Sequence, residues 1–255
     1  MIELTNVSAG YRRNAVLHDV TIAFRPGEVT AILGPNGCGK STLLRAALGL
    51  LPCMTGQIAY DGVDIRRMKR REIARQAAFL TQSRGAASIQ ALRMVLHGRF
   101  PYLSYPRRYG KRDYEAARLA MAATGCASYE SALVSELSGG QRQSVYLAMA
   151  LTQDTQTVFM DEPTTFLDIG RQLQTMQTAR ALARDGKAVV LVLHDLPLAL
   201  RGADRVAVFS EGSLVGYGTP EEIYFSGVLD RVFGVTLHAV DTPHGRQYYC
   251  TPKEE

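Results

Sequence analysis

The stretch that decides the fold is residues 29–42, which read Val-Thr-Ala-Ile-Leu-Gly-Pro-Asn-Gly-Cys-Gly-Lys-Ser-Thr. Its second part matches the phosphate-loop template G-x-x-x-x-G-K-[ST] at every fixed position. The apolar residues 29–33 predict a buried parallel strand, and residues 43–48 predict a helix, so the loop stands between the two elements that the template requires. We therefore predict that phosphate groups are cradled by Gly34, Pro35, Asn36, Gly37, Cys38, Gly39, Lys40, Ser41 and Thr42.

The residue types at the fixed positions of this loop are those that phosphate binding requires. Glycines allow backbone N–H groups to close on phosphate oxygens, and the N-terminus of the following helix adds a partial positive charge. Lys40 can reach the β- and γ-phosphates of a nucleotide, and the Ser41 hydroxyl can ligate Mg²⁺. The helix N-terminus and the Lys40 ammonium also predict a lowered pKa, and hence a reactive thiolate, for Cys38.

A second predicted strand, residues 157–160, ends in the acidic pair Asp161 and Glu162. Ligands of an open α/β sheet bind at the carboxyl ends of its strands, so this pair is expected near the phosphate loop. We expect Asp161 to hold Mg²⁺ in its outer shell or through water. Glu162 is expected to polarise the attacking water as general base.

Two further predicted strands end in polar side chains that could reach the same place. Residues 188–193 end in His194, which is a candidate contact to the γ-phosphate. Residues 77–81 end in Gln82, which is a candidate contact to the metal or to the attacking water. Neither side chain alone indicates a binding role. Their common position at the ends of predicted strands, where open α/β sheets bind ligands, favours one.

Residues 137–141, Leu-Ser-Gly-Gly-Gln, form a second glycine-rich peptide at the start of an apolar helix. Ser138, Gly139, Gly140 and Gln141 therefore predict a separate phosphate-binding half-site. A chain with one nucleotide cradle and a second half-site elsewhere is expected to work in pairs.

Together, these motifs resemble the nucleotide-binding subunit of an ATP-binding cassette (ABC) transporter over about residues 1–220. The resemblance implies ATP and Mg²⁺ as ligands, with Tyr11 stacked on adenine. It implies a head-to-tail dimer of two copies, in which Lys40, Asp161 and Glu162 of one copy meet Ser138, Gly139 and Gln141 of the other. Asp168 matches the segment that crosses the dimer interface.

The resemblance extends to a subfamily. Residues 161–169 and 97–102 are similar to the motors of importers for iron-siderophores, haem and cobalamin, and a ferric siderophore is the first expectation for the substrate. Implied partners are transmembrane permease subunits and, indirectly, a substrate-binding protein. Phe100 and Tyr102 stand in a stretch too apolar for a free loop, so they are expected to be buried in this chain's core or under a permease helix.

The expected fold class is α/β, a P-loop NTPase core with a mostly parallel sheet in a single domain spanning residues 1–255. The first 25 residues predict strands of a small antiparallel sheet, and residues 84–155 predict an inserted helical subdomain. Residues 221–255 carry no readable motif. Apolar runs are too short to span a bilayer, so the membrane part is expected to be another chain and this chain is expected at the cytoplasmic face of the inner membrane. Four separated cysteines predict reduced thiols.

The net charge of +5 comes from 29 basic and 24 acidic residues, which is too mild to require nucleic acid as a partner. Two local clusters, residues 66–71 and 107–112, are more basic. They could meet anionic lipid head groups beside a permease, or they could be solvated surface.

Two other classes of P-loop protein are possible: a soluble kinase or GTPase, and an ATPase that acts on nucleic acid or ribosomes. A kinase or GTPase has no use for residues 137–141, and the chain has no Asn-Lys-x-Asp guanine motif. Repair ATPases split the cassette with a long coiled coil, and translation factors usually carry two cassettes. Only 54 residues lie between Gln82 and Leu137, so a transport motor is favoured over an ATPase that acts on nucleic acid or ribosomes.

Overall fold

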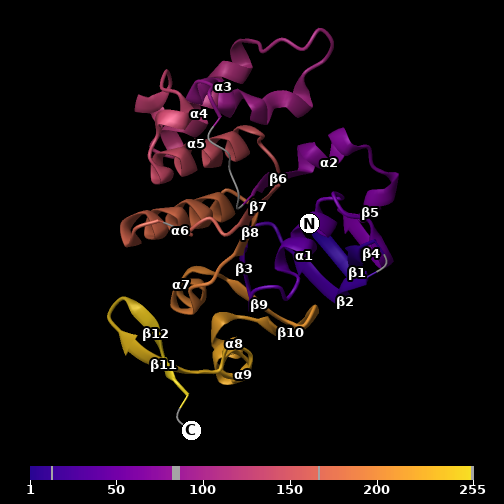
Figure 1. Cartoon of the computed structure of the whole chain (residues 1–255), viewed down its shortest axis with the longest axis vertical. Helices are drawn as coiled ribbons and strands as arrows, with labels where there is room; N and C mark the ends of the chain where they lie inside the picture. Colours follow the sequence, from indigo (N-terminus) through magenta and orange to yellow (C-terminus); the bar gives the residue numbers. More distant parts are fainter. Residues whose placement is uncertain (13, 82–86, 166, 254–255) are drawn as a thin grey trace.

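A six-stranded sheet crosses the molecule in the order β10-β9-β3-β8-β7-β6 (Figure 1). The computed structural model describes residues 1–12, 14–81, 87–165 and 167–253. Five strands are mutually parallel and β10 pairs antiparallel with β9. The predicted α/β fold with a mostly parallel sheet is therefore confirmed. The strands are β3 (Val29–Leu33), β6 (Ala77–Leu80), β7 (Thr157–Asp161), β8 (Ala188–Val192), β9 (Arg205–Ser210) and β10 (Ser213–Gly218).

The central strands are buried on both faces, which is why their sequences are mostly apolar, with Thr30 in β3 and Thr157 and Asp161 in β7 as buried polar residues. In β8, Val189 and Leu191 point into one hydrophobic core, whereas Val190 and Val192 point into a second core on the opposite face. Every residue of β3, β7 and β8 is buried. The ends of these strands are therefore held rigidly, and that is where the polar groups begin.

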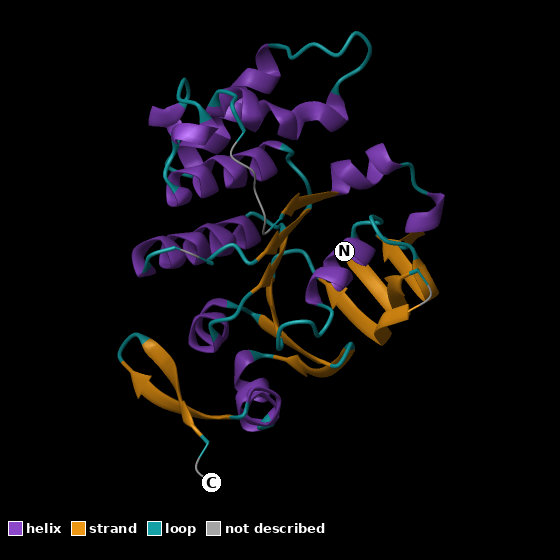
Figure 2. Cartoon of the chain, in the orientation of Figure 1, coloured by secondary structure: helices purple, strands orange, loops and turns teal. Residues whose placement is uncertain are grey.

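On one face of this sheet lie the antiparallel sheet and helix α1 (Figure 2). The antiparallel strands run in the order β2-β1-β4-β5, as β1 (Ile2–Tyr11), β2 (Asn14–Phe24), β4 (Cys53–Tyr60) and β5 (Val63–Asp64). Strands β1 and β2 form the antiparallel sheet that the sequence predicts for the first 25 residues, and their buried apolar residues share a core with α1 (Lys40–Ala47). Phe24 meets Phe159 of the main sheet edge to face, with ring centroids 5.5 Å apart.

Helices α6 (Ile169–Arg184) and α7 (Leu196–Gly202) cover the other face, and a layer of helices extends beyond β6 at the top of Figure 1. The expected helical segment, residues 84–155, contains most of this layer. Its elements are α3 (Ala91–Leu96), η2 (His97–Tyr102), α4 (Lys111–Ala123), η3 (Ala127–Tyr129), η4 (Val134–Glu136) and α5 (Gly139–Thr152). Between the antiparallel sheet and β6 lie η1 (Ile65–Arg67) and α2 (Arg70–Gln76).

The C-terminal segment, which carries no readable sequence motif, folds against α7. It forms α8 (Pro220–Phe225), α9 (Val228–Phe233) and a hairpin of β11 (Val235–Thr242) with β12 (Gly245–Pro252). Leu237 and Tyr248 of the hairpin join the core that lies under α6 and α7. No helix in the described part of the chain combines the length and the apolar character needed to cross a membrane.

Candidate active site

A hollow of about 410 Å³ opens at the carboxyl ends of β3, β8 and β7, which are neighbours in the sheet. The loop after β3, the Glu162 side chain after β7 and the His194 side chain after β8 all reach it. Its lining consists of Val16, Asn36, Gly37, Gly39, Lys40, Ser41, Thr42, Glu162 and His194. Segments more than 150 residues apart along the chain thus meet at one place, as expected for an open α/β sheet.

The loop between β3 and α1 has no room for side chains at two of its glycines. A Cβ at Gly34 would lie 2.4 Å from the carbonyl oxygen of Phe209. Gly39 has a φ of +102°, and a Cβ there would lie 2.8 Å from Cδ2 of Leu17. Both positions therefore require glycine, and the tight loop directs the N-terminus of α1 into the hollow.

Lys40, the first residue of α1, is 6% exposed. Its ammonium donates to the carbonyl oxygens of Gly34 at 2.7 Å and Pro35 at 2.9 Å. It has no ion pair with any carboxylate in the described residues. A buried cation balanced only by carbonyl dipoles is well suited to an anionic ligand.

Asp161 is buried at the end of β7, and the Ser41 hydroxyl donates to its carboxylate. Burial is the main reason that the pKa of Asp161 is raised, and this outweighs the Ser41 hydrogen bond, which lowers it. Its Oδ1 atom has no hydrogen-bond partner among the described residues. An orphaned carboxylate oxygen beside a hydroxyl suits Mg²⁺, a hard cation that prefers oxygen ligands.

No group of three or more His, Cys, Asp or Glu in the described ranges could hold a metal ion by itself. Mg²⁺ usually keeps several waters and takes one or two protein oxygens together with substrate phosphates. The chemistry of Ser41 and Asp161 is therefore compatible with a metal that arrives with a nucleotide, rather than with a permanent metal centre.

Glu162 is held from two sides. The Nε2 atom of His194 lies 2.6 Å from its Oε1, and the Thr165 hydroxyl donates to its Oε2 at 3.1 Å. The Glu162 backbone has a φ of +51°, a left-handed conformation that is uncommon for a residue other than glycine. The side chain is thereby aimed at the hollow, with only 13% of its surface exposed. Thr165 is not among the residues predicted from the sequence, because its only signal there is a hydroxyl three residues after the acid.

The expectation for Cys38 is wrong. Its side chain is buried, with 5% exposure, and burial raises the pKa of the thiol. The Lys40 charge and two backbone hydrogen bonds lower the pKa, but by less than burial raises it. Sequence proximity to a helix N-terminus and to a lysine did not reveal that the Cys38 side chain points away from the hollow, into the core between the two sheets.

Tyr11 lies at the end of β1 and is 43% exposed. Its hydroxyl accepts a hydrogen bond of 2.8 Å from Arg45 of α1. Val16 of β2, which the sequence analysis did not select, lines the hollow itself. Its only sequence signal is its place in an alternating strand that follows Tyr11. Gln82 lies outside the described residues.

The peptide of residues 138–141 does not reach this hollow. Ser138 caps α5, because its hydroxyl accepts the backbone N–H of Gln141 at 3.3 Å while the Gln141 side chain accepts the N–H of Ser138 at 2.9 Å. Gly139 and Gly140 form the first turn of the helix. Asp168 caps α6 by accepting the N–H of Arg171 at 2.9 Å, and it too lies outside the lining of the hollow.

Two contacts connect α5 to the segment that follows Glu162. The Gln143 amide donates to the carbonyl oxygen of Pro163 at 2.6 Å. The Arg171 side chain packs on Gly140, where a Cβ would lie 3.0 Å from its Cδ. The glycine-rich start of α5 and the acidic segment after β7 therefore touch within one chain. The sequence analysis selected neither Gln143 nor Arg171.

The fold and the site define a P-loop nucleoside triphosphatase, because a glycine loop, a buried lysine, a hydroxyl and two carboxylates converge at the carboxyl edge of a parallel sheet. Comparison with known proteins narrows this class. The family model described as ABC transporter matches residues 17–165, more than half of the chain. The chain belongs to the ABC transporter family of ATP-binding proteins, and it is an ATPase.

Individual relatives agree with this assignment. The chain is similar to the ferric enterobactin transport ATP-binding protein FepC of Escherichia coli (strain K12), with 38% identity over 93% of this chain and 88% of the relative. It is also similar to the hemin import ATP-binding protein HmuV of Myxococcus xanthus (strain DK1622), with 37% identity over 95% and 93% of the two chains.

Two solved structures show the same fold. A metal-chelate type ABC transporter in an inward-facing conformation superposes with a TM-score of 0.85 at 22% identity, covering 99% of this chain and 97% of the other. A dimeric ATP-binding cassette in a post-hydrolysis state, bound to ADP and Pi, superposes with a TM-score of 0.76 at 26% identity, covering 86% and 99%.

Proposed function

We propose that this chain hydrolyses ATP to drive uptake of a ferric siderophore, with haem and cobalamin as the runner-up substrates. The observation that carries the catalytic part is the convergence of Lys40, Ser41, Glu162 and His194 on one hollow. The substrate part is supported by relatives named for ferric enterobactin and hemin, and by the subfamily resemblance of residues 97–102 and 161–169. Relatives of both kinds lie at almost equal identity, so haem remains the alternative.

In the proposed chemistry, Lys40 exchanges its carbonyl partners for the β- and γ-phosphates, and the loop residues 34–42 give their N–H groups to the same oxygens. The Ser41 hydroxyl would ligate Mg²⁺, and Asp161 would hold it in its outer shell or through water. The ion would supply positive charge opposite the phosphates. Gln82 is proposed to contact the metal or the attacking water, and Tyr11 to stack on adenine.

Glu162 is the proposed general base. Its carboxylate is positioned by Thr165 and by His194, which lies 2.6 Å away at the edge of the hollow. A base must be within hydrogen-bond reach of the water that it deprotonates, and the fixed side chain satisfies that need at the mouth of the phosphate loop. His194 is proposed to contact the γ-phosphate as well, so one imidazole would orient the base and sense the substrate.

A second copy of the chain is the proposed partner that supplies Ser138, Gly139, Gly140, Gln141 and Asp168. Within one chain these residues lie outside the hollow, while the first-turn amides of the 14-residue helix α5 offer an anion site at a helix N-terminus. Head-to-tail pairing would bring this site onto the ATP of the other copy. The dimeric cassette among the similar structures supports this arrangement.

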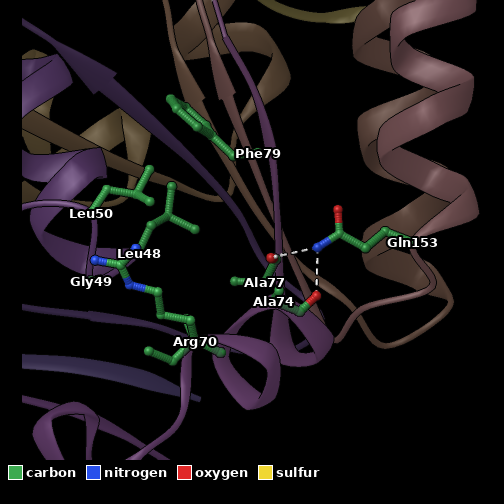
Figure 3. A pocket seen from close by; sticks show the side chains of 9 residues that line it. Leu48, Gly49, Leu50, Arg70, Ala74, Ala77, Phe79 and Gln153 are labelled. Carbon is green, nitrogen blue, oxygen red and sulfur yellow. Dashed lines mark hydrogen bonds between the residues drawn. The ribbon is translucent and has the colours of Figure 1, made fainter. Parts of the chain in front are cut away.

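Permease subunits are the other proposed partners, and a groove beside β6 offers them a place (Figure 3). The groove holds about 340 Å³ between the end of α1, α2 and β6. Leu50, which lines the groove, is 65% exposed. On another side of the groove, the Gln153 amide donates to the carbonyl oxygens of Ala74 and Ala77. A permease helix in this groove would keep the chain at the cytoplasmic face of the membrane, with a substrate-binding protein on the far side.

The two aromatic residues near the groove differ in their surroundings. The Tyr102 hydroxyl donates to the carbonyl oxygen of Gln153 at 2.9 Å, so Tyr102 packs within this chain. Phe100 is 49% exposed. Of the two alternatives left open by the sequence, burial in this chain therefore fits Tyr102 better, and contact with a permease fits Phe100 better.

The substrate is tested by uptake in a strain that lacks this gene. We expect the deletion strain to lose uptake of radiolabelled ferric siderophore, and the wild-type gene to restore it. Phe100→Ala should restore less uptake, because a buried aromatic anchor at an interface is typically worth about 2 kcal/mol or more, while ATPase activity of the isolated subunit persists. Loss of haem or cobalamin uptake alone would replace the siderophore, and normal uptake of all three would refute the subfamily assignment.

A further inference from the structure

The positive charge of this chain is concentrated in two segments. Residues 64–75 contain six basic and two acidic residues, and residues 99–115 contain five basic and two acidic residues. Their combined excess of seven positive charges exceeds the net charge of +5 of the whole chain. The remainder of the molecule is therefore slightly acidic, and the basic character is a local property.

The fold joins these two segments into one surface, which we call the basic rim. Arg71 of α2 donates to the carbonyl oxygens of Pro101 at 2.6 Å and Leu103 at 2.8 Å. Arg75, one turn further along α2, also donates to Pro101 and lies over the Tyr102 ring. These contacts tie α2 to η2, although about 30 residues separate them in sequence.

Most charges of the basic rim have no carboxylate partner. Among the described residues, the ion pairs that involve a cation of the basic rim are those of Arg66 with Asp64, Arg99 with Asp113 and, at 3.9 Å, Lys111 with Glu115. The exposed cations that remain without an ion pair are Arg67, Lys69, Arg70, Arg71, Arg75, Arg107, Arg108 and Arg112. Like charges gathered on one surface repel each other, and an anionic surface opposite them relieves that repulsion.

Two exposed aromatic side chains stand among these cations. Tyr105 is 96% exposed and Phe100 is 49% exposed, with the Arg107 guanidinium 4.7 Å from the centre of the Phe100 ring. Aromatic rings mixed with arginine and lysine are characteristic of surfaces that lie at the membrane–water interface. A surface that is merely solvated gains nothing from exposing an aromatic ring in this way.

The basic rim also adjoins the apolar groove of Figure 3, because Arg70 lines that groove. This step rests on the proposed function. A permease helix seated in the groove would place the basic rim on the side of the chain that faces the bilayer.

We propose that the basic rim binds the head groups of anionic phospholipids beside the permease. The cations supply the attraction to the negative surface, at about fivefold in affinity for each arginine or lysine near it. Tyr105, which is almost fully exposed, supplies contact with the interfacial region. The attraction falls within a Debye length, so it acts only while the chain is docked close to the membrane and weakens with salt.

The test is flotation of the purified full-length chain, without nucleotide, with vesicles of phosphatidylcholine alone or mixed equally with phosphatidylglycerol. We expect binding to the mixed vesicles at low salt, release at high salt, and little binding to phosphatidylcholine. Arg67→Gln and Arg108→Gln should each weaken binding about fivefold, and the double variant should lose both contributions. Tyr105→Ala should weaken binding to the mixed vesicles at low salt, although it removes no charge.

The matched control is Arg184→Gln, because Arg184 is an exposed arginine at the end of α6, outside the basic rim. ATP binding by every variant checks that the fold is retained. Equal binding to both vesicle types, or equal loss in Arg184→Gln and in the double variant, would overturn the proposal. Tighter binding of a DNA duplex, lost in the same variants, would also overturn it, since the rim would then be a nucleic-acid surface.

The flotation assay is independent of the proposed function. A chain that floats with anionic vesicles but does not hydrolyse ATP would refute the catalytic proposal alone. A chain that hydrolyses ATP but ignores the vesicles would refute this inference alone.

Discussion

The phosphate loop and the start of α5 are both glycine-rich helix N-termini, yet they are built differently. The phosphate loop lies at the carboxyl ends of the central strands of the main sheet. Lys40 follows it directly, and Asp161, Glu162 and His194 lie nearby. The start of α5 lies in the helical layer, and its Ser138 and Gln141 side chains cap their own helix. One site carries its own charges and acid–base groups, whereas the other offers a hydroxyl and backbone amides.

In the proposed dimer, this difference is the reason that neither site would be sufficient alone. The phosphate loop has the groups proposed for hydrolysis, but its hollow is lined only by β2, by the loop and first turn after β3 and by the residues that follow β7 and β8, and α5 does not reach it. The start of α5 can cover an anion but has no base or metal ligand in its capping box. Substitutions should therefore separate catalysis from pairing according to which of the two sites they touch.

The largest effect is expected for Glu162→Gln at the phosphate loop. The amide keeps the shape and the contacts to Thr165 and His194 but cannot accept the proton of the attacking water. We expect turnover to fall about 10²–10⁴-fold, with ATP affinity nearly unchanged and bound ATP holding the dimer closed. Steady-state ATPase and equilibrium nucleotide binding measure the two quantities. Parental turnover in this variant would show that Glu162 is not the base.

Ser138→Arg at the start of α5 should impair pairing, and turnover with it, while nucleotide binding by the single chain is retained. A bulky cation there blocks close approach of a γ-phosphate to the hydroxyl and the helix amides, and loss of such preorganised donors typically costs about 10²–10³-fold in turnover. Nucleotide affinity of the monomer should stay the same. Sedimentation with ATP in the Glu162→Gln background measures pairing. Joint loss of binding and pairing would contradict the separation of the two sites.

The rate at which a maleimide modifies Cys38 tests how the phosphate loop is packed. Its raised pKa and its burial predict slow modification by a maleimide, about tenfold or more slower than Cys53, which is partly exposed. MgATP should slow Cys38 further and leave Cys53 unchanged. Peptide mass spectrometry after timed labelling gives both rates. Faster labelling of Cys38 than of Cys53 would mean that the loop opens or that the thiol is ionised after all.

The smallest effect is expected for Asp161→Asn, which should stabilise the fold while impairing hydrolysis. Burial raises the pKa of Asp161 in the folded state, so the folded chain binds this proton more tightly than the unfolded chain, and stability falls as pH rises through the interval between the two pKa values. The variant should gain about 1 kcal/mol at neutral pH, and the gain should shrink in acid. Urea unfolding at several pH values measures this, and a constant difference would exclude titration of Asp161.

Much of the main sheet could be predicted, because strands buried on both faces are mostly apolar and the polar residues at their carboxyl ends mark where they stop. This holds for β3, β7 and β8 and for the groups after them. Thr165 and Val16 could not be predicted, because a hydroxyl in a turn and a valine in a strand look the same whether or not they face a ligand. The pKa of Cys38 was misjudged because a side chain's direction is set by packing and not by its sequence neighbours.

The contacts of α5 with the segment after β7 would couple the two nucleotide sites of a dimer. Gln143 holds Pro163, the residue after Glu162, and Arg171 lies on Gly140. In the proposed head-to-tail pair, α5 would contact the nucleotide bound by the other copy, while Glu162 would act on the nucleotide bound by its own chain. A shift of α5 on a distant phosphate is then transmitted directly to the base beside the near one. Such coupling is reciprocal for binding free energies, so a nucleotide at one site is expected to change the affinity of the other site for its nucleotide by the same factor as the reverse.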